Sequence, residues 1–147
     1  MITLPELRSK PVILVVDDEP EILVALTDLL EDTYTVLSAS SGEQGLRVLE
    51  QQPDVAVIIS DQRMPNMTGD AFLAKARQLS SAGAVLLTGY ADISAVEAAL
   101  NRGQISFFAY KPWDDETLLS VSYKYLTPPA DQLLQVSAVP VDFKHEY

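Results

Sequence analysis

Short aliphatic runs and longer amphipathic segments alternate along most of this chain. Three runs rich in β-branched residues, at 12–16, 55–59 and 84–87, predict strands that are buried on both faces of a sheet. Two weaker runs, at 35–38 and 106–110, complete a set of five predicted strands.

Each predicted strand is followed by a segment of helical length, and in most of these segments apolar residues recur at helical spacing. Ser41 and Gln44, three residues apart, form a capping-box pattern at the start of the second segment. Asp92 is a candidate N-cap for the fourth segment. The five helices are expected at about 20–30, 41–53, 70–79, 92–103 and 114–126.

Strict alternation of strands and helices favours a parallel sheet with helices on both faces. Because crossovers between parallel strands are right-handed, a doubly wound α/β fold is the natural closure. In such folds the ligand binds at the carboxyl ends of the strands. The residues that directly follow each predicted strand are therefore the candidates for function.

Composition narrows the possible functions further. The chain has 147 residues, a formal net charge of −11 and no cysteine. Direct binding of nucleic acid or of an anionic membrane is not expected from so acidic a chain. The absence of cysteine excludes thiolate chemistry and fits a cytoplasmic protein, and no apolar stretch approaches the ~18 residues of a membrane helix.

The domain boundaries follow from the same patterns. We expect one domain at residues 10–126, preceded by an N-terminal extension at 1–9. Residues 127–147 contain three prolines and have no clear periodicity, which is typical of a tail or linker.

Five polar residues of suitable chemistry follow four of the predicted strands. They are Asp17, Asp18, Asp61, Thr88 and Lys111. Acidic side chains at one sheet edge repel each other unless a cation lies among them, and oxygen ligands suit Mg²⁺. A carboxylate beside such an ion could accept a phosphoryl group, with a hydroxyl and an ammonium group nearby to neutralise the transferred oxygens. Each aspartate taken alone could equally be only a helix cap.

Taken together, these segments resemble the receiver domains of two-component response regulators. The phospho-accepting aspartate of that family corresponds to Asp61. The successive intervals are 43 residues from Asp18 to Asp61, 27 from Asp61 to Thr88 and 23 from Thr88 to Lys111. The resemblance covers residues 10–126 and implies a flavodoxin-like (βα)5 fold with strand order 2-1-3-4-5. The segments that carry it are Val15-Val16-Asp17-Asp18-Glu19, Ser60-Asp61-Gln62-Arg63-Met64-Pro65 with Gly69, Leu87-Thr88-Gly89 and Tyr110-Lys111-Pro112-Trp113.

The resemblance also implies roles for individual residues near the phospho-acceptor. Asp61 would be phosphorylated by a histidine kinase or a phosphotransfer protein. Asp18 and Asp61 would hold Mg²⁺ together with the backbone carbonyl of Arg63, and Asp17 would act mainly through water. Lys111 would pair with Asp61 and then with the phosphoryl group.

A second set of implied roles concerns the response to phosphorylation. The Thr88 hydroxyl would follow the phosphoryl group, and Phe108 occupies the position of the family's aromatic switch. In this family the positions of Arg63 and Tyr90 flank the path of the hydrolytic water. Neither side chain is suited to orienting water, and Arg63 could hold a phosphoryl oxygen, so we expect a long-lived phosphorylated state.

The resemblance implies a signalling switch without conventional turnover. The surface formed by the fourth predicted helix, the fifth strand and the fifth helix would control an output partner or form a homodimer. The run from Leu87 to Asp92 is similar to receivers attached to cyclic-di-GMP phosphodiesterase or transcriptional-activator modules.

Two alternatives use similar residues. A Mg²⁺-dependent phosphatase with an aspartyl nucleophile would need a second aspartate two residues after Asp61, where this chain has Arg63. A flavin-binding domain of the same topology would need a hydroxyl-rich loop after the first strand, where this chain has two aspartates.

Overall fold

The computed structural model describes residues 10–124, so the predicted extension at 1–9 and the tail at 127–147 lie outside the described residues. Five parallel strands form one sheet in the order β2-β1-β3-β4-β5, as the resemblance implies. The central strand β3 runs two residues further than its aliphatic run, so that Asp61 is its last residue. The strands are β1 (Val12–Val16), β2 (Thr35–Ala39), β3 (Val55–Asp61), β4 (Gly83–Thr88) and β5 (Phe107–Tyr110).

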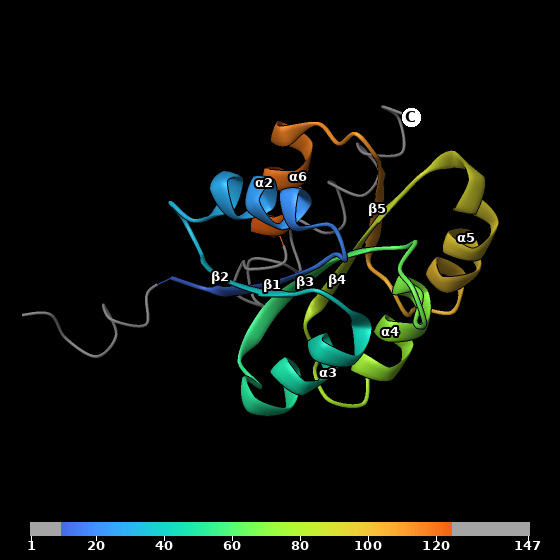
Figure 1. Cartoon of the computed structure of the whole chain (residues 1–147), viewed down its shortest axis with the longest axis horizontal. Coiled ribbons are helices and arrows are strands. Elements are labelled where there is room, and N and C mark those ends of the chain that lie inside the picture. Colours follow the sequence, from blue (N-terminus) through green and yellow to red (C-terminus); the bar gives the residue numbers. More distant parts are fainter. Residues whose placement is uncertain (1–9, 125–147) are drawn as a thin grey trace, which may run out of the picture.

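The helices lie in two layers, one on each face of the sheet. Helices α2 and α6 cover one face, and α3, α4 and α5 cover the other (Figure 1). A short 3-10 helix, η1 (Tyr90–Asp92), leads directly into α5. The α-helices are α2 (Pro20–Leu30), α3 (Gly42–Gln51), α4 (Gly69–Ala76), α5 (Ile93–Asn101) and α6 (Asp115–Lys124).

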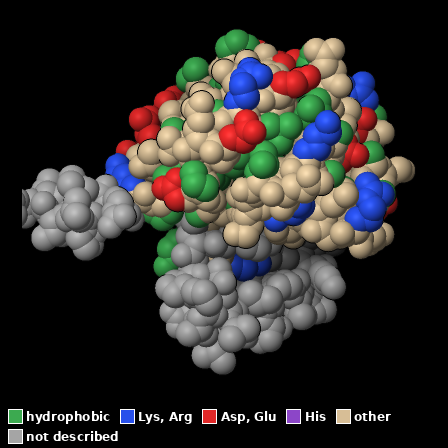
Figure 2. Space-filling view, turned by 90° about the horizontal axis from the view of Figure 1, so that it is seen from below, with side chains coloured by type: hydrophobic (Ala, Val, Ile, Leu, Met, Phe, Trp, Pro, Cys, Tyr) green, Lys and Arg blue, Asp and Glu red, His purple; other side chains and the backbone are tan. Residues whose placement is uncertain are grey.

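Alternate residues of the strands build two separate cores. Leu14 and Val16 of β1 point towards α3, α4 and α5, whereas Ile13 and Val15 point towards α2 and α6. All four side chains are fully buried. Burying an aliphatic side chain of this size stabilises the fold by about 1.5–3 kcal/mol, so both cores hold the sheet in place. The outer surface of the α3–α4–α5 layer mixes charged and hydrophobic side chains (Figure 2).

Two of the predicted helix starts have the expected side-chain cap. At the third, Asp92 occupies the N-cap position, but its side chain does not cap the helix. The Ser41 hydroxyl accepts a hydrogen bond of 3.1 Å from the Gln44 backbone N–H. The Asp114 carboxylate accepts one of 2.9 Å from the Thr117 backbone N–H. Asp92 is the N-cap residue of α5, but within residues 10–124 its side chain caps no backbone N–H, because its carboxylate binds Arg63 instead. The third helix ends at Ala76 rather than near 79.

Close backbone packing fixes the loop that follows Asp61. The Gly69 N–H donates a hydrogen bond of 2.9 Å to the Gln62 carbonyl, which folds the start of α4 back against the end of β3. A Cβ atom on Gly69 would overlap the Asp61 carbonyl oxygen and press on the Leu86 side chain. Position 69 therefore requires glycine, because the Asp61 backbone and the Leu86 side chain leave no room for a Cβ atom.

We expect Gly69→Ala to destabilise the protein by about 1–3 kcal/mol, because the backbone of Asp61 must move to admit the methyl group. Gly89→Ala is the matched control, since a Cβ atom there meets nothing within 4 Å. The control should stay within about 0.5 kcal/mol of the wild type. Urea unfolding measures both variants, and equal stability of the two would contradict this account of the loop.

Candidate functional site

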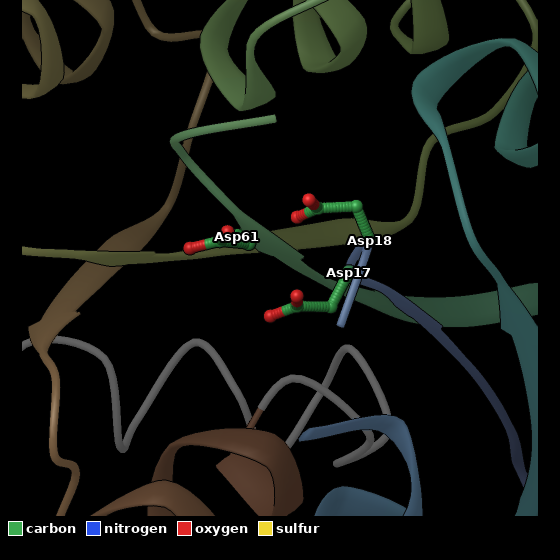
Figure 3. Close-up of side chains that lie close together, drawn as sticks. All are labelled: Asp17, Asp18 and Asp61. Atoms are coloured by element: carbon green, nitrogen blue, oxygen red, sulfur yellow. The ribbon is translucent and has the colours of Figure 1, made fainter. Parts of the chain in front are cut away.

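Three aspartates meet at the carboxyl edge of the sheet. Asp17 and Asp18 directly follow β1, and Asp61 ends the neighbouring strand β3. One carboxylate oxygen from each lies within 4.8 Å of the others, and Figure 3 shows the three side chains gathered at this edge. Asp17 is fully buried, Asp61 is 5% exposed and Asp18 is open to solvent. The predicted acidic cluster is therefore present in the fold.

Lys111, which follows the edge strand β5, contacts two of these carboxylates. Its Nζ lies 3.1 Å from Asp61 Oδ1 and 3.4 Å from Asp17 Oδ2. The residue directly follows β5, and its backbone N–H donates a hydrogen bond of 2.9 Å to the Thr88 carbonyl. That bond fixes the start of the lysine side chain at the level of the acids.

Burial and charge act against each other in this cluster. Burial raises the pKa of Asp61, and the hydrogen bond from Lys111 opposes that rise without cancelling it. Burial likewise raises the pKa of Asp17, against its hydrogen bond from the Glu19 backbone and the charge of Lys111. Burial opposes protonation of Lys111, but Asp61 and Asp17 outweigh it and raise the lysine pKa.

Asp17 also orders the turn that follows β1. Its Oδ1 accepts a hydrogen bond of 2.9 Å from the Glu19 backbone N–H, directly before α2. The same carboxylate thus orders the turn into α2 through one oxygen and contacts Lys111 through the other. Asp17 is therefore a member of the cluster and orders the turn, but it is not the N-cap of α2, because Glu19 occupies that position.

A pair of side chains that the sequence did not single out orders the loop after Asp61. The Gln62 amide donates to Asp70 Oδ1 and accepts from the Asp70 backbone N–H, both at 2.9 Å. The Thr68 hydroxyl donates to the same Asp70 oxygen. These bonds span the residue whose backbone carbonyl is the expected metal ligand, Arg63. A single sequence carries no signal for such a pair, since glutamine and aspartate eight residues apart are common.

The expected switch residues lie on β4 and β5. Thr88 is buried at the end of β4, and its hydroxyl donates 2.9 Å to the Gly89 carbonyl. Phe108 is half-buried and meets Tyr110 edge-on, with ring centroids 5.8 Å apart. Tyr90, on η1, stacks on the Tyr110 ring with ring centroids 4.0 Å apart. Three aromatic rings therefore connect η1 to β5.

An open pocket of about 380 Å³ lies beside the acidic cluster. Asp61 and Lys111 line it, and so do Arg63, Tyr90 and Asp92 from the two loops above. Arg63 binds Asp92 through two hydrogen bonds, Nε to Oδ2 at 3.2 Å and Nη2 to Oδ1 at 2.8 Å. The hydrogen bond to Asp92 raises the pKa of Arg63, and the one from Arg63 lowers the pKa of Asp92.

A parallel sheet with two buried aspartates, a lysine and an open pocket at its carboxyl edge is the arrangement expected of a phospho-accepting signalling domain. A family model described as "Response regulator receiver domain" matches residues 13–122. The chain belongs to the receiver domains of response regulators, and it acts in phosphorylation-dependent signalling.

Among similar proteins, a probable chemotaxis protein CheY of Rhizobium etli is 32% identical over 76% of this chain and 89% of its own length. The hydrogenase transcriptional regulatory protein HoxA of Cupriavidus necator is 36% identical over 73% of this chain. The match covers only 22% of HoxA, so the chain spans about a fifth of that relative.

Two solved structures show the same fold. A response regulator receiver domain protein from Clostridium thermocellum has a TM-score of 0.76 and 30% identity, over 84% of this chain and 98% of that one. The signal receiver domain of an HD domain-containing protein from Pseudomonas fluorescens has a TM-score of 0.72 and 35% identity, over 80% and 94% of the two chains.

The comparisons support neither the phosphatase nor the flavin-binding alternative. At the place of the phosphatase's second aspartate, the structure has an arginine that binds Asp92. Among residues 10–124, no helix is long and apolar enough to span a membrane.

Because burial raises the pKa of Asp61, the folded chain binds a proton there more tightly than the unfolded chain does. Ionisation of Asp61 therefore lowers stability as the pH rises from 3.8 through the raised value. We expect Asp61→Asn to gain stability relative to the wild type over that window and to level off above it. Urea unfolding without divalent cations, from about pH 4 to about pH 8, measures the difference.

Asp92→Asn is a control of opposite sign. Arg63 lowers the pKa of Asp92, so the ionised form contributes stability that is lost as the pH falls through the lowered value. This variant should be less stable than the wild type at neutral pH and should approach it in acid. A stability difference for Asp61→Asn that does not change with pH would show that its carboxylate is not destabilised by burial.

Proposed function

We propose that Asp61 is the phospho-acceptor of this receiver domain. The observation that carries the proposal is the contact of 3.1 Å between Lys111 and an Asp61 carboxylate that lines the open pocket. Asp17 shares the lysine but is fully buried, so a phosphoryl donor cannot reach it. Asp61 thus combines access with a neighbouring positive charge.

The transfer itself is a displacement at phosphorus. A carboxylate oxygen of Asp61 forms a bond to phosphorus as the bond from phosphorus to the donor breaks. The donor is the phosphohistidine of a sensor histidine kinase or phosphotransfer protein, or a small acyl phosphate. Lys111 lies where its ammonium group can neutralise the transferred oxygens, which is the main requirement of phosphoryl transfer.

The donor set of the cluster fits Mg²⁺. Three carboxylates with no histidine in the group are hard oxygen ligands, and Mg²⁺ usually takes one or two of these. Asp18 and Asp61 would bind it directly with the Arg63 carbonyl, and Asp17 would contribute through water. When bound, the ion supplies positive charge against the carboxylates and the phosphoryl oxygens.

The response would travel through Thr88 and Phe108 to the surface formed by α5, β5 and α6. The Thr88 hydroxyl would turn from the Gly89 carbonyl towards the phosphoryl group, and the half-buried Phe108 would repack. Because Phe108 lacks a hydroxyl, the change at this ring uses packing rather than a hydrogen bond. The α5–β5–α6 surface would then bind an output partner or a second copy of the chain.

The named relatives suggest which kind of output this receiver domain controls. HoxA is a transcriptional regulatory protein, and the Pseudomonas fluorescens relative contains an HD domain. We infer a cytoplasmic switch, not a conventional enzyme, that controls a transcriptional-activator or cyclic-di-GMP phosphodiesterase output. The chain would signal without binding nucleic acid or membrane itself.

Asp61→Asn should abolish labelling by acetyl phosphate in the presence of Mg²⁺, because the attacking carboxylate is gone. Intact-mass spectrometry should show one added phosphoryl group per wild-type chain and none in the variant. Asp54→Asn is the matched control, since Asp54 is exposed and directly precedes β3, at the opposite end of the strand from Asp61, and it should label like the wild type. Full labelling of Asp61→Asn would disprove the assignment, and multiple turnover of acetyl phosphate would favour a phosphatase.

Asp18→Ala should weaken Mg²⁺ binding by roughly tenfold or more, because a direct carboxylate ligand is lost. Asp54→Ala removes one negative charge away from the cluster and should leave the affinity unchanged. Isothermal titration or amide shifts in an NMR titration measure the dissociation constant. Equal affinities of the wild type and Asp18→Ala would show that Asp18 is not a ligand.

A further inference from the structure

The Arg63–Asp92 ion pair connects the two loops that border the phospho-acceptor pocket. Arg63 follows β3 by two residues, and Asp92 ends η1, which follows β4. The two residues are 29 positions apart in the sequence, and both line the pocket with Asp61 and Lys111. Arg63 is 75% exposed, so the guanidinium is free of packing constraints.

Asp92 is held in a state that prevents it from capping α5. It occupies the N-cap position, where aspartate is among the favoured residues. However, both its carboxylate oxygens bind Arg63, and its backbone angles of φ −103° and ψ 10° continue η1. An N-cap residue is usually extended, so capping would need both the side chain and the end of η1 to change.

We propose that Arg63 is a two-position latch between the unphosphorylated and phosphorylated states. In the unphosphorylated chain its guanidinium holds Asp92, and after phosphorylation it moves to the phosphoryl oxygens and releases Asp92. The proposal rests on Asp61 being the phospho-acceptor. Arg63 is a positioning residue here, and no bond other than hydrogen bonds is made or broken.

Charge and geometry favour the exchange. A phosphoryl group carries more negative charge than a carboxylate and offers three acceptor oxygens to the planar fork of an arginine. Arg63 already experiences the negative charge of Asp61. The ion pair it must leave is largely exposed on the arginine side, and exposed pairs contribute little stability. The phosphoryl group is therefore a stronger partner for Arg63 than Asp92 is.

Release of Asp92 would act on the start of α5. The freed carboxylate can accept hydrogen bonds from the N–H groups of Ser94 or Ala95, the second and third residues of the helix. Asp92 would become extended, and η1 would lose its last residue to the cap. Because the stack of Tyr90 on Tyr110 holds the other end of η1, the change is confined to the entry of α5.

The test uses NMR of the full chain with Mg²⁺ and beryllium fluoride, which mimics a phosphoryl group on a carboxylate. We expect the Arg63 Nε–H and Asp92 carboxyl-carbon resonances to shift on loading, together with the amides of Ser94 and Ala95. In unloaded Arg63→Gln these two amides should already lie near their positions in the loaded wild type. In Asp92→Ala the Arg63 shift should persist.

Phosphoryl lifetime after acetyl phosphate treatment gives an independent measure. Asp92→Ala leaves Arg63 without a competing partner and should prolong the lifetime, whereas Arg63→Gln should shorten it, each by roughly two- to fivefold. Glu97→Ala and Arg102→Gln are the charge-matched controls, since both residues are exposed on or next to α5 and lie outside the pocket. The controls should match the wild type.

The outcomes separate this proposal from the assignment of Asp61. If the Asp61 amide responds to the mimic while the Arg63 Nε–H, Ser94 and Ala95 signals stay in place, the latch is wrong and the acceptor stands. Unchanged lifetimes in both Arg63→Gln and Asp92→Ala would also overturn the latch. If Asp61→Asn binds the mimic as the wild type does, the acceptor assignment fails and the latch fails with it.

Discussion

The contact of Lys111 with two buried carboxylates is the interaction on which the site depends. Asp17 directly follows β1 and Asp61 ends the neighbouring strand β3, and without a positive charge their burial would drive them to bind protons. One ammonium group at 3.1 and 3.4 Å compensates both only in part, since the pKa values of both aspartates remain raised. Three carboxylates also face a single ammonium group, so when they are ionised the cluster carries excess negative charge, which a bound divalent ion would relieve.

The order of the strands makes this arrangement possible. Placing β3 between β1 and β4 puts Asp61 next to the end of β1, and β4 separates it from β5. Lys111 therefore reaches the acids across one strand, and its backbone is bound to the last residue of that strand, Thr88. The hydrophobic side chains on both faces of the sheet hold these strand ends in register, so the site inherits its precision from the two cores.

Much of this was predictable from the sequence, because it depends on periodicity and on which residues follow strands. The five strands, their parallel arrangement and the meeting of Asp17, Asp18, Asp61 and Lys111 follow from patterns that act within one element or at one sheet edge, whereas the order of the strands was implied by the resemblance to receiver domains. The diversion of Asp92 from its cap position could not be predicted, because a local preference of aspartate was overruled by an arginine 29 residues away. The reciprocal pair of Gln62 and Asp70 is another case, since its partners become neighbours only after the loop has folded.

The site therefore divides into a buried part that is fixed and an exposed part that can change. Moving a buried aspartate or the lysine would leave an uncompensated charge in the protein interior, which is strongly destabilising. Arg63 is 75% exposed, and its ion pair with Asp92 can be exchanged at small energetic cost. Residues of this second kind can set how long a signal lasts without endangering the fold. In this chain Arg63 also joins the pocket to the start of α5 through Asp92, so under the proposed latch the lifetime of the phosphorylated state and the conformation at the entry of α5 would depend on the same side chain.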